Sequence, residues 1–163
     1  MSHLSTETVF IEDLDALAKA VGENPLLEWR PNQRKFRWFA GKTNDCEGAI
    51  CLRGVGENLD YEIGVVRHGK GATANINGKM VDISGKCQLQ WDSYGRALRD
   101  AVGGDLSQLT QRYSYHALYN VARKQGYTVK ESLNDKGEVQ LAFAKAGAVA
   151  GGRSSSAWSG TSW

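Results

Sequence analysis

The chain has 163 residues, of which 41% are hydrophobic and 23% are charged. This length suits one ordinary domain with a hydrophobic core, and the composition excludes disordered, collagen-like and coiled-coil proteins. The 20 basic and 18 acidic residues nearly balance at a net charge of +2, which excludes the overall positive field that drives non-specific nucleic-acid binding.

The first part of the chain predicts a strand, a helix and three further strands. The strands are expected over residues 6–11, 35–40, 49–53 and 61–67, and the helix over residues 14–21. The strand segments are β-branched or aromatic and are separated by turn residues, whereas the helical segment has apolar residues at helical spacing before a glycine. Consecutive strands with short connections favour an antiparallel meander. Asp60 and Glu62 are carboxylates close together in the sequence, and a solvated strand face explains them at least as well as a catalytic pair does.

The rest of the chain predicts a hairpin, two helices and two strands. They are a hairpin in residues 68–90, helices over 91–102 and 106–125, and strands over 127–131 and 138–145. Asn77-Gly78 supplies the positive φ angles of the tight turn in the first hairpin. We therefore predict a single α+β domain over residues 1–145, with an antiparallel sheet and with the long helix and the N-terminal helix packed on one face.

The last residues, 146–163, are mostly glycine, serine and alanine. Such a segment buries too little apolar area to offset the entropy of ordering, so it predicts a flexible tail. Trp158 and Trp163 interrupt the tail, and they are candidate anchors for a protein partner. Isolated exposed aromatic residues are also common without any function, so both interpretations are open.

The cysteines favour a reducing compartment, because Cys46, Cys51 and Cys87 cannot all form disulfides. They also lack the close pair of ligands that is typical of zinc sites, so we predict no bound metal and no other cofactor. The first residues lack the pattern of a secretion signal, and no apolar stretch is long enough to cross a membrane. We expect a cytoplasmic location, or an equivalent one such as the plastid stroma or the cytoplasm of a phage-infected host.

The long predicted helix carries the most informative pattern. It contains no acidic residue, and five side chains that suit anion binding fall within a stripe of roughly 100°. These are Arg112, Tyr115, His116, Tyr119 and Arg123. Arginine donates paired hydrogen bonds to phosphate or carboxylate groups, and tyrosine provides a stacking surface. A solvated helix face with half-buried tyrosines has the same pattern, and this alternative is open as well.

A second candidate is the segment 29–42, in which basic and aromatic residues alternate. Proteins bind single-stranded nucleic acid with such a combination, because aromatic rings stack on bases and cations neutralise phosphates. Lys35, Arg37 and Trp38 are the candidate contacts. In a strand, however, Lys35 and Arg37 face one side and Trp38 the other, so one buried face and one solvated basic face is the simpler interpretation.

Several runs of residues resemble one known family. They are LTQRYSYH at 109–116, ARKQGY at 122–127, KGEVQL at 136–141, the opening MSHLST and YEIG at 61–64. Together they are similar to the hypothetical chloroplast reading frame thirty-five family, which occurs in cyanobacteria, plastids, other bacteria and phages and has no established function. The glycine-rich stretch 69–86 and the tail depart from the family pattern.

The resemblance implies a compact α+β domain in an intracellular setting, and it implies no particular reaction. It raises Arg112, Tyr115 and His116 as candidate functional residues, because they lie in the matching run.

These patterns predict a non-enzymatic binding or adaptor protein. Its ligand is expected to be anionic, namely a nucleotide-like molecule, a nucleic acid or an acidic protein surface. No catalytic residue is predicted, because no Asp or Glu lies on the helix face to orient His116. Two alternatives are open: an enzyme that acts on a phosphate-containing substrate through His116, and a structural subunit of a larger assembly that docks through its tail. The oligomeric state is left open.

Overall fold

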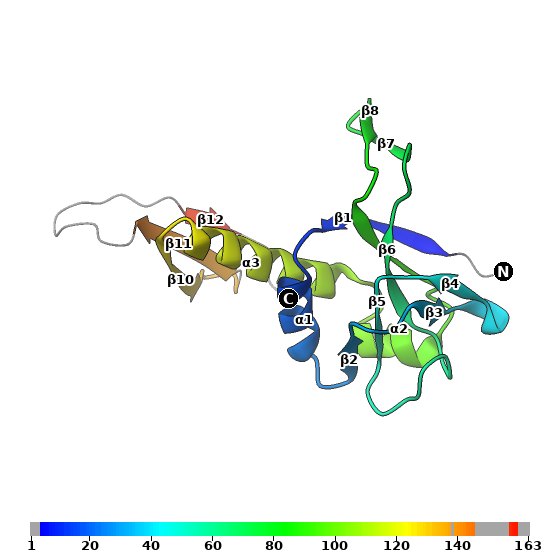
Figure 1. Ribbon diagram of the computed structural model, residues 1–163. Coiled ribbons are helices and arrows are strands. Elements are labelled where there is room, and N and C mark those ends of the chain that lie inside the picture. The colour runs from blue at the N-terminus through cyan, green and yellow to red at the C-terminus, as the bar shows by residue number, and fades with distance from the viewer. Residues whose placement is uncertain (1–3, 138, 146–156, 160–163) are drawn as a thin grey trace. The chain divides into compact units, whose positions relative to one another are not determined.

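The computed structural model describes residues 4–137, 139–145 and 157–159 (Figure 1). The chain forms two compact units, Met1–Leu106 and Ser107–Trp163. The predicted α+β class is confirmed, with an antiparallel sheet, an N-terminal helix and a long helix in the second half of the chain. The single domain over residues 1–145 stays a prediction.

The first unit is built on a five-stranded antiparallel sheet with the strand order β1-β9-β6-β5-β2. In that order the strands are Ser5–Ile11, Cys87–Trp91, Ile63–Arg67, Gly48–Leu52 and Leu27–Arg30. The neighbouring strands β5 and β6 form the centre of the core, because Ala49, Ile50, Ile63 and Val65 are all fully buried. Continuous apolar runs of this length are typical of a strand that is covered on both faces.

Two helices belong to this unit. Helix α1 (Leu14–Gly22) begins after Asp13, whose side chain accepts a hydrogen bond from the backbone N–H of Ala16 at 3.0 Å, as expected for an N-cap residue. Helix α2 (Arg96–Val102) begins five residues later than predicted, because strand β9 extends to Trp91. Gly95 precedes α2, and a side chain at that position would overlap with the ring of Tyr61.

Two small hairpins complete the first unit. Strands β3 (Lys35–Arg37) and β4 (Thr43–Asp45) form one, and β7 (Thr73–Ile76) and β8 (Lys79–Asp82) form the other. Strand β3 is shorter than predicted, because a 3-10 turn follows it at Phe39–Gly41. The predicted turn of the second hairpin is confirmed, since both Asn77 and Gly78 have positive φ angles, of 52° and 83°.

The second unit consists of one long helix and a small sheet. Helix α3 (Ser107–Lys124) precedes a three-stranded antiparallel sheet with the order β10-β11-β12. These strands are Tyr127–Leu133, Val139–Lys145 and Ala157–Ser159. The predicted helix and the hairpin after it are confirmed. Strand β12 lies in the segment predicted as a tail, and the other residues of that segment lie outside the described part of the chain.

Replacing Gly64 with alanine is expected to destabilise the first unit, because a Cβ at this position would overlap with the fully buried ring of Phe36. Overpacking of this kind costs about 1–3 kcal/mol of unfolding free energy. Urea denaturation measures the loss. Gly69→Ala is the matched control, since nothing lies within 4 Å of a Cβ there. Equal midpoints for both variants would contradict the packing described.

Candidate functional site

Four side chains on helix α3 form a continuous ladder of cations and aromatic rings. The guanidinium carbon of Arg112 lies 4.4 Å from the ring centroid of Tyr115. The rings of Tyr115 and Tyr119 are stacked, with centroids 6.4 Å apart. The guanidinium carbon of Arg123 lies 6.0 Å from the ring centroid of Tyr119. We call Arg112, Tyr115, Tyr119 and Arg123 the α3 ladder.

The ladder follows directly from the sequence spacing. Its members are three, four and four residues apart, and residues at these intervals lie above one another on a helix. Each contact between a guanidinium and a ring contributes about 0.5–1 kcal/mol at an exposed site. The side chains therefore hold one another in place. The same helical spacing puts all five residues predicted on this face on one side of the helix. His116 lies beside the ladder, with its ring edge-on to Tyr115 at a centroid distance of 4.9 Å.

A hydrogen bond connects the ladder to the sheet of the same unit. The hydroxyl of Tyr115 donates to Oε2 of Glu131 on β10 at 2.6 Å. Partial burial, followed by this hydrogen bond and the negative charge of Glu131, raises the pKa of Tyr115 to about 12. Tyr115 therefore stays protonated at neutral pH and keeps donating to Glu131. The sequence pattern did not predict this contact, because Glu131 lies on another element.

The charge of the second unit suits an anionic ligand. Ser107–Trp163 has seven basic and three acidic residues, for a formal charge of +4, whereas Met1–Leu106 has −2. Helix α3 itself has three basic residues and no acidic one, and two of them, Arg123 and Lys124, lie in its last turn. A positive potential around this helix favours the approach of anions.

The second set of candidate residues belongs to the first unit. Lys35 Nζ forms an ion pair with Asp45 at 2.8 Å, and Arg37 Nη1 donates to two backbone carbonyls in the loop before β6, at 3.2 and 3.1 Å. Trp38 packs against the buried cluster around Phe36. These contacts hold local structure, so they favour the simpler interpretation of one buried and one solvated face.

Of the two candidate anchors in the predicted tail, Trp158 lies in strand β12, where its backbone is opposite Leu141. Trp163 lies outside the described residues. Docking of a partner through Trp158 and Trp163 stays a prediction.

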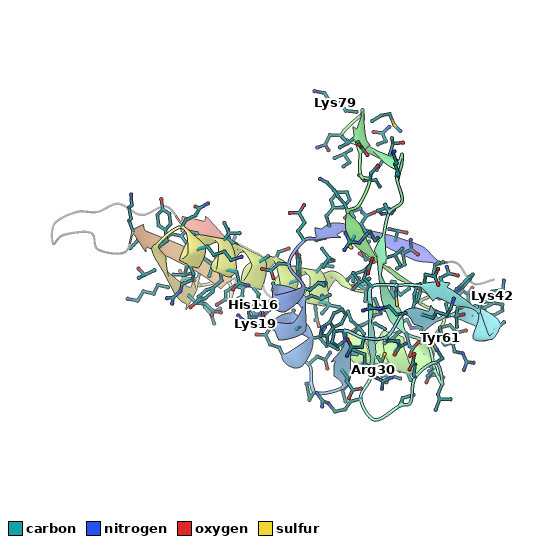
Figure 2. All side chains as sticks on the ribbon, in the orientation of Figure 1. Lys19, Arg30, Lys42, Tyr61, Lys79 and His116 are labelled. Carbon is teal, nitrogen blue, oxygen red and sulfur yellow. The ribbon has the colours of Figure 1, made fainter. Side chains whose placement is uncertain are left out.

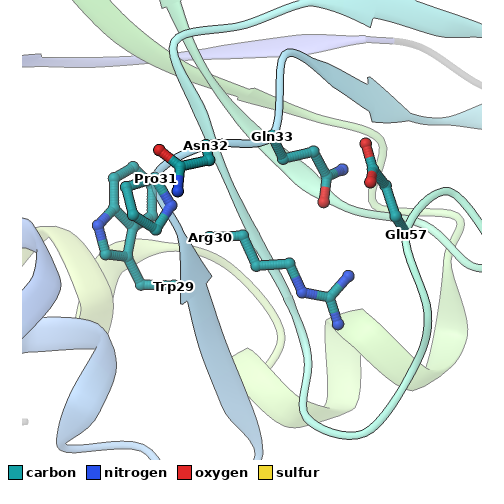
Figure 3. A pocket seen from close by; sticks show the side chains of 6 residues that line it. All are labelled: Trp29, Arg30, Pro31, Asn32, Gln33 and Glu57. Atoms are coloured by element: carbon teal, nitrogen blue, oxygen red, sulfur yellow. The ribbon is translucent and has the colours of Figure 1, made fainter.

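A pocket in the first unit was not predicted from the sequence. It has a volume of about 370 Å³ and is lined by residues 29–33 and Glu57. Figure 3 shows the Arg30 and Gln33 side chains extending toward the loop that carries Glu57. Arg30 Nε already pairs with Glu28 at 2.6 Å, and its Nη2 donates to the carbonyl of Val55. The guanidinium of Arg30 therefore uses several of its donors within the protein itself.

A buried carboxylate was placed wrongly by the sequence pattern. Glu62 is 2% exposed rather than solvated, and its oxygens accept the backbone N–H groups of Arg37 at 2.8 Å and Asn58 at 3.1 Å. Strand β3 and the loop before β6 thus each supply a backbone donor to this carboxylate. The sequence alone does not tell whether Glu62 is buried, because a polar residue next to a turn is buried or exposed according to which segment covers it in the fold.

The three cysteines are buried and free. Burial, and next the negative charge of Glu62, raises the pKa of the Cys51 thiol well above its usual range, and burial raises the pKa of Cys46 to about 11. Such thiols are poor nucleophiles at neutral pH. Among the described residues, no cluster of three or more His, Cys, Asp or Glu side chains could hold a metal ion.

Comparisons with known proteins add no relative: no family model, no curated protein and no solved structure matches the chain. Within residues 4–137, 139–145 and 157–159, every helix is too short or too polar to cross a membrane. The α3 ladder therefore stands as the candidate site on its own geometry.

Tyr115→Phe is expected to lower the unfolding free energy by about 0.5–1.5 kcal/mol, the usual contribution of one hydrogen bond. Glu131→Gln and the double variant complete a cycle whose coupling energy isolates the contact. Tyr127→Phe, on the same sheet, is the control. Because folding raises the pKa of Tyr115 from 10.0 to about 12, its contribution is fully present below pH 10 and is lost as the pH rises through 12. Additive effects of the two single variants would refute the contact.

Proposed function

We propose that this chain is a non-enzymatic binding protein that recognises single-stranded nucleic acid through the α3 ladder. The observation that carries the proposal is a pair of stacked tyrosine rings between two guanidinium groups, on a helix without acidic residues. Single-stranded nucleic acid is bound by this combination in proteins, because cations neutralise the phosphates and aromatic rings stack on the bases.

The ladder supports binding because it orders the arginines before a ligand arrives. Guanidinium groups bind phosphate oxygens through the N–H groups at their edge, whereas stacking on a ring engages their face. Arginine side chains lose up to about 2 kcal/mol of rotamer entropy on being fixed. A side chain already held against Tyr115 or Tyr119 loses less of this entropy on binding, so the ladder raises affinity through preorganisation.

The length of the ladder favours a polymer over a small anion. Arg112 and Arg123 are eleven residues apart, which at 1.5 Å per residue separates them by about 16 Å along the helix axis. A single phosphate group reaches one of them, whereas a strand with several phosphates reaches both. This spacing favours nucleic acid over a nucleotide-like molecule. The tyrosine rings between the two cations favour bases over the carboxylates of an acidic protein surface.

Two further properties, the location of the protein and its family, are also proposed. We propose a cytoplasmic location, or the equivalent plastid stroma or infected-host cytoplasm, and membership of the hypothetical chloroplast reading frame thirty-five family on the runs quoted above. The alternatives of an enzyme that uses His116 and of a structural subunit docked through its tail stay predictions.

Arg112→Ala and Arg123→Ala should each weaken binding by a factor between about 10 and about 100, since a charge-assisted hydrogen bond contributes about 1.5–3 kcal/mol. Fluorescence anisotropy with a labelled single-stranded oligonucleotide of about 16 nucleotides measures the affinity. The salt dependence of binding should also become shallower, by about 0.7 in the logarithmic slope for each phosphate of the single strand that the variant leaves without a cation.

Lys124→Ala is the matched control for Arg123→Ala. It removes one positive charge from the next residue of the same helix, about 100° around the helix axis from the ladder. It should therefore weaken binding much less. Equal losses of affinity for Arg123→Ala and Lys124→Ala would mean that only the charge matters. Unchanged affinity in both Arg112→Ala and Arg123→Ala would rule out the ladder as the binding site.

A further inference from the structure

The hairpin β7–β8 stands apart from the five-stranded sheet of the first unit. Its two strands pair only with each other among the described strands, and Figure 1 shows them projecting beyond β1 and β6. We call residues 69–86, which contain these strands and their stem, the β7–β8 finger. Two-stranded hairpins have little core of their own and are marginally stable in water, so the stem must hold the finger in place.

The stem is well connected. The backbone of His68 bonds to that of Lys86 in one direction and to that of Gly85 in the other, at 2.8 and 2.9 Å, and Ile83 is 4% exposed. Asp82 accepts hydrogen bonds from the N–H and hydroxyl of Ser84, at 2.9 and 2.6 Å, which lower the pKa of its carboxyl. Asp82, the single acidic residue within residues 69–86, therefore stabilises the base of the finger through these hydrogen bonds.

The charge of the finger is opposite to that of the unit that carries it. Residues 69–86 contain three lysines and one aspartate, for a formal charge of +2, which leaves −4 on the rest of Met1–Leu106. Lys70 and Lys79 are exposed, and Figure 2 shows Lys79 at the tip. A cationic projection on an otherwise acidic body orients the finger toward a polyanion and the body away from it.

Apolar side chains are exposed at the tip beside this charge. Met80 is 67% exposed and Ile76 is 37% exposed, and the register places Met80 opposite Asn75 and Ile76 opposite Lys79. In the major groove of DNA, amide side chains read the edge of adenine, and apolar side chains contact the methyl group of thymine. Apolar, amide and ammonium groups are therefore combined within the last residues of the ribbon.

We propose that the β7–β8 finger binds double-stranded DNA by entering the major groove, with its lysines on the phosphates at the edges of the groove and with Asn75 and Met80 against the bases. A two-stranded ribbon fits the major groove of B-form DNA, which is about 8.5 Å deep. Strands of four residues reach about 13 Å, enough to bring the tip to the bases. A-form RNA has a major groove too narrow for side chains to read, so DNA is the expected duplex. The finger is independent of the α3 ladder, which belongs to the other unit.

The experiment measures binding of the full chain to a labelled DNA duplex of about 20 base pairs over a range of salt concentrations. The variant Lys70→Gln/Lys79→Gln should bind about tenfold more weakly at low salt, and its logarithmic salt slope should fall by about 2, one for each phosphate that these lysines neutralise. Lys19→Gln/Arg96→Gln removes the same charge from α1 and α2 and should bind like the parent.

A second variant tests the tip. Met80→Ser should weaken duplex binding several-fold at every salt concentration, because it removes an apolar contact and no charge. The exposed position of Met80 predicts an unchanged urea midpoint, which separates weaker binding from unfolding.

The two sites have separable outcomes. Arg112→Ala should keep duplex binding, and the finger lysine variant should keep single-stranded binding. The finger proposal is overturned if the parent does not bind the duplex, if both charge-matched double variants lose affinity equally, or if duplex RNA of the same sequence binds as tightly as DNA.

Discussion

Phe36 lies directly on the backbone of Gly64, at the centre of the five-stranded sheet, and much of the first unit depends on this contact. A side chain at position 64 would overlap with the ring, so the close approach needs glycine. The ring brings the β3–β4 hairpin onto β5 and β6, where Cys46, Ala49 and Cys51 pack against it. Interiors are packed as densely as organic crystals, so a methyl group inserted here has no space to enter.

The same packing explains why the loop before β6 has a defined path. With Phe36 in place, the backbone N–H of Arg37 points at Glu62 and donates to it. An unpaired carboxylate in this position would cost several kcal/mol, so the N–H groups that satisfy it are a condition of the fold. The loop also carries Val55 and Glu57, which line the hollows of the first unit. Packing therefore fixes the path of the loop together with its local turns, such as the one that the N–H of Leu59 closes on the carbonyl of Gly56 at 3.2 Å.

The candidate binding sites of this protein lie on its surface rather than in its cavities. The larger hollow, of about 550 Å³, is lined mainly by apolar side chains, and the guanidinium of Arg53 at its rim donates to the carbonyls of Pro25 and Leu27. Arg30 is engaged in a similar way in the smaller pocket. The α3 ladder and the β7–β8 finger both combine cations with aromatic, amide or apolar groups. Extended polyanions are bound by surfaces of this kind, because they need many spaced contacts instead of one enclosed site.

Features that depend on near neighbours along the chain can be predicted from the sequence. The ladder on α3 follows from intervals of three and four residues, and the tip of the finger follows from Asn77-Gly78, because helix periodicity and positive φ angles are local properties. Features that join distant segments emerge only in the folded chain. They are the burial of Glu62, the ion pair of Lys35 with Asp45, and the hydrogen bond from Tyr115 to Glu131. In each case the partner lies on another element or loop, and whether a polar side chain meets water or a partner depends on what the folded chain places beside it.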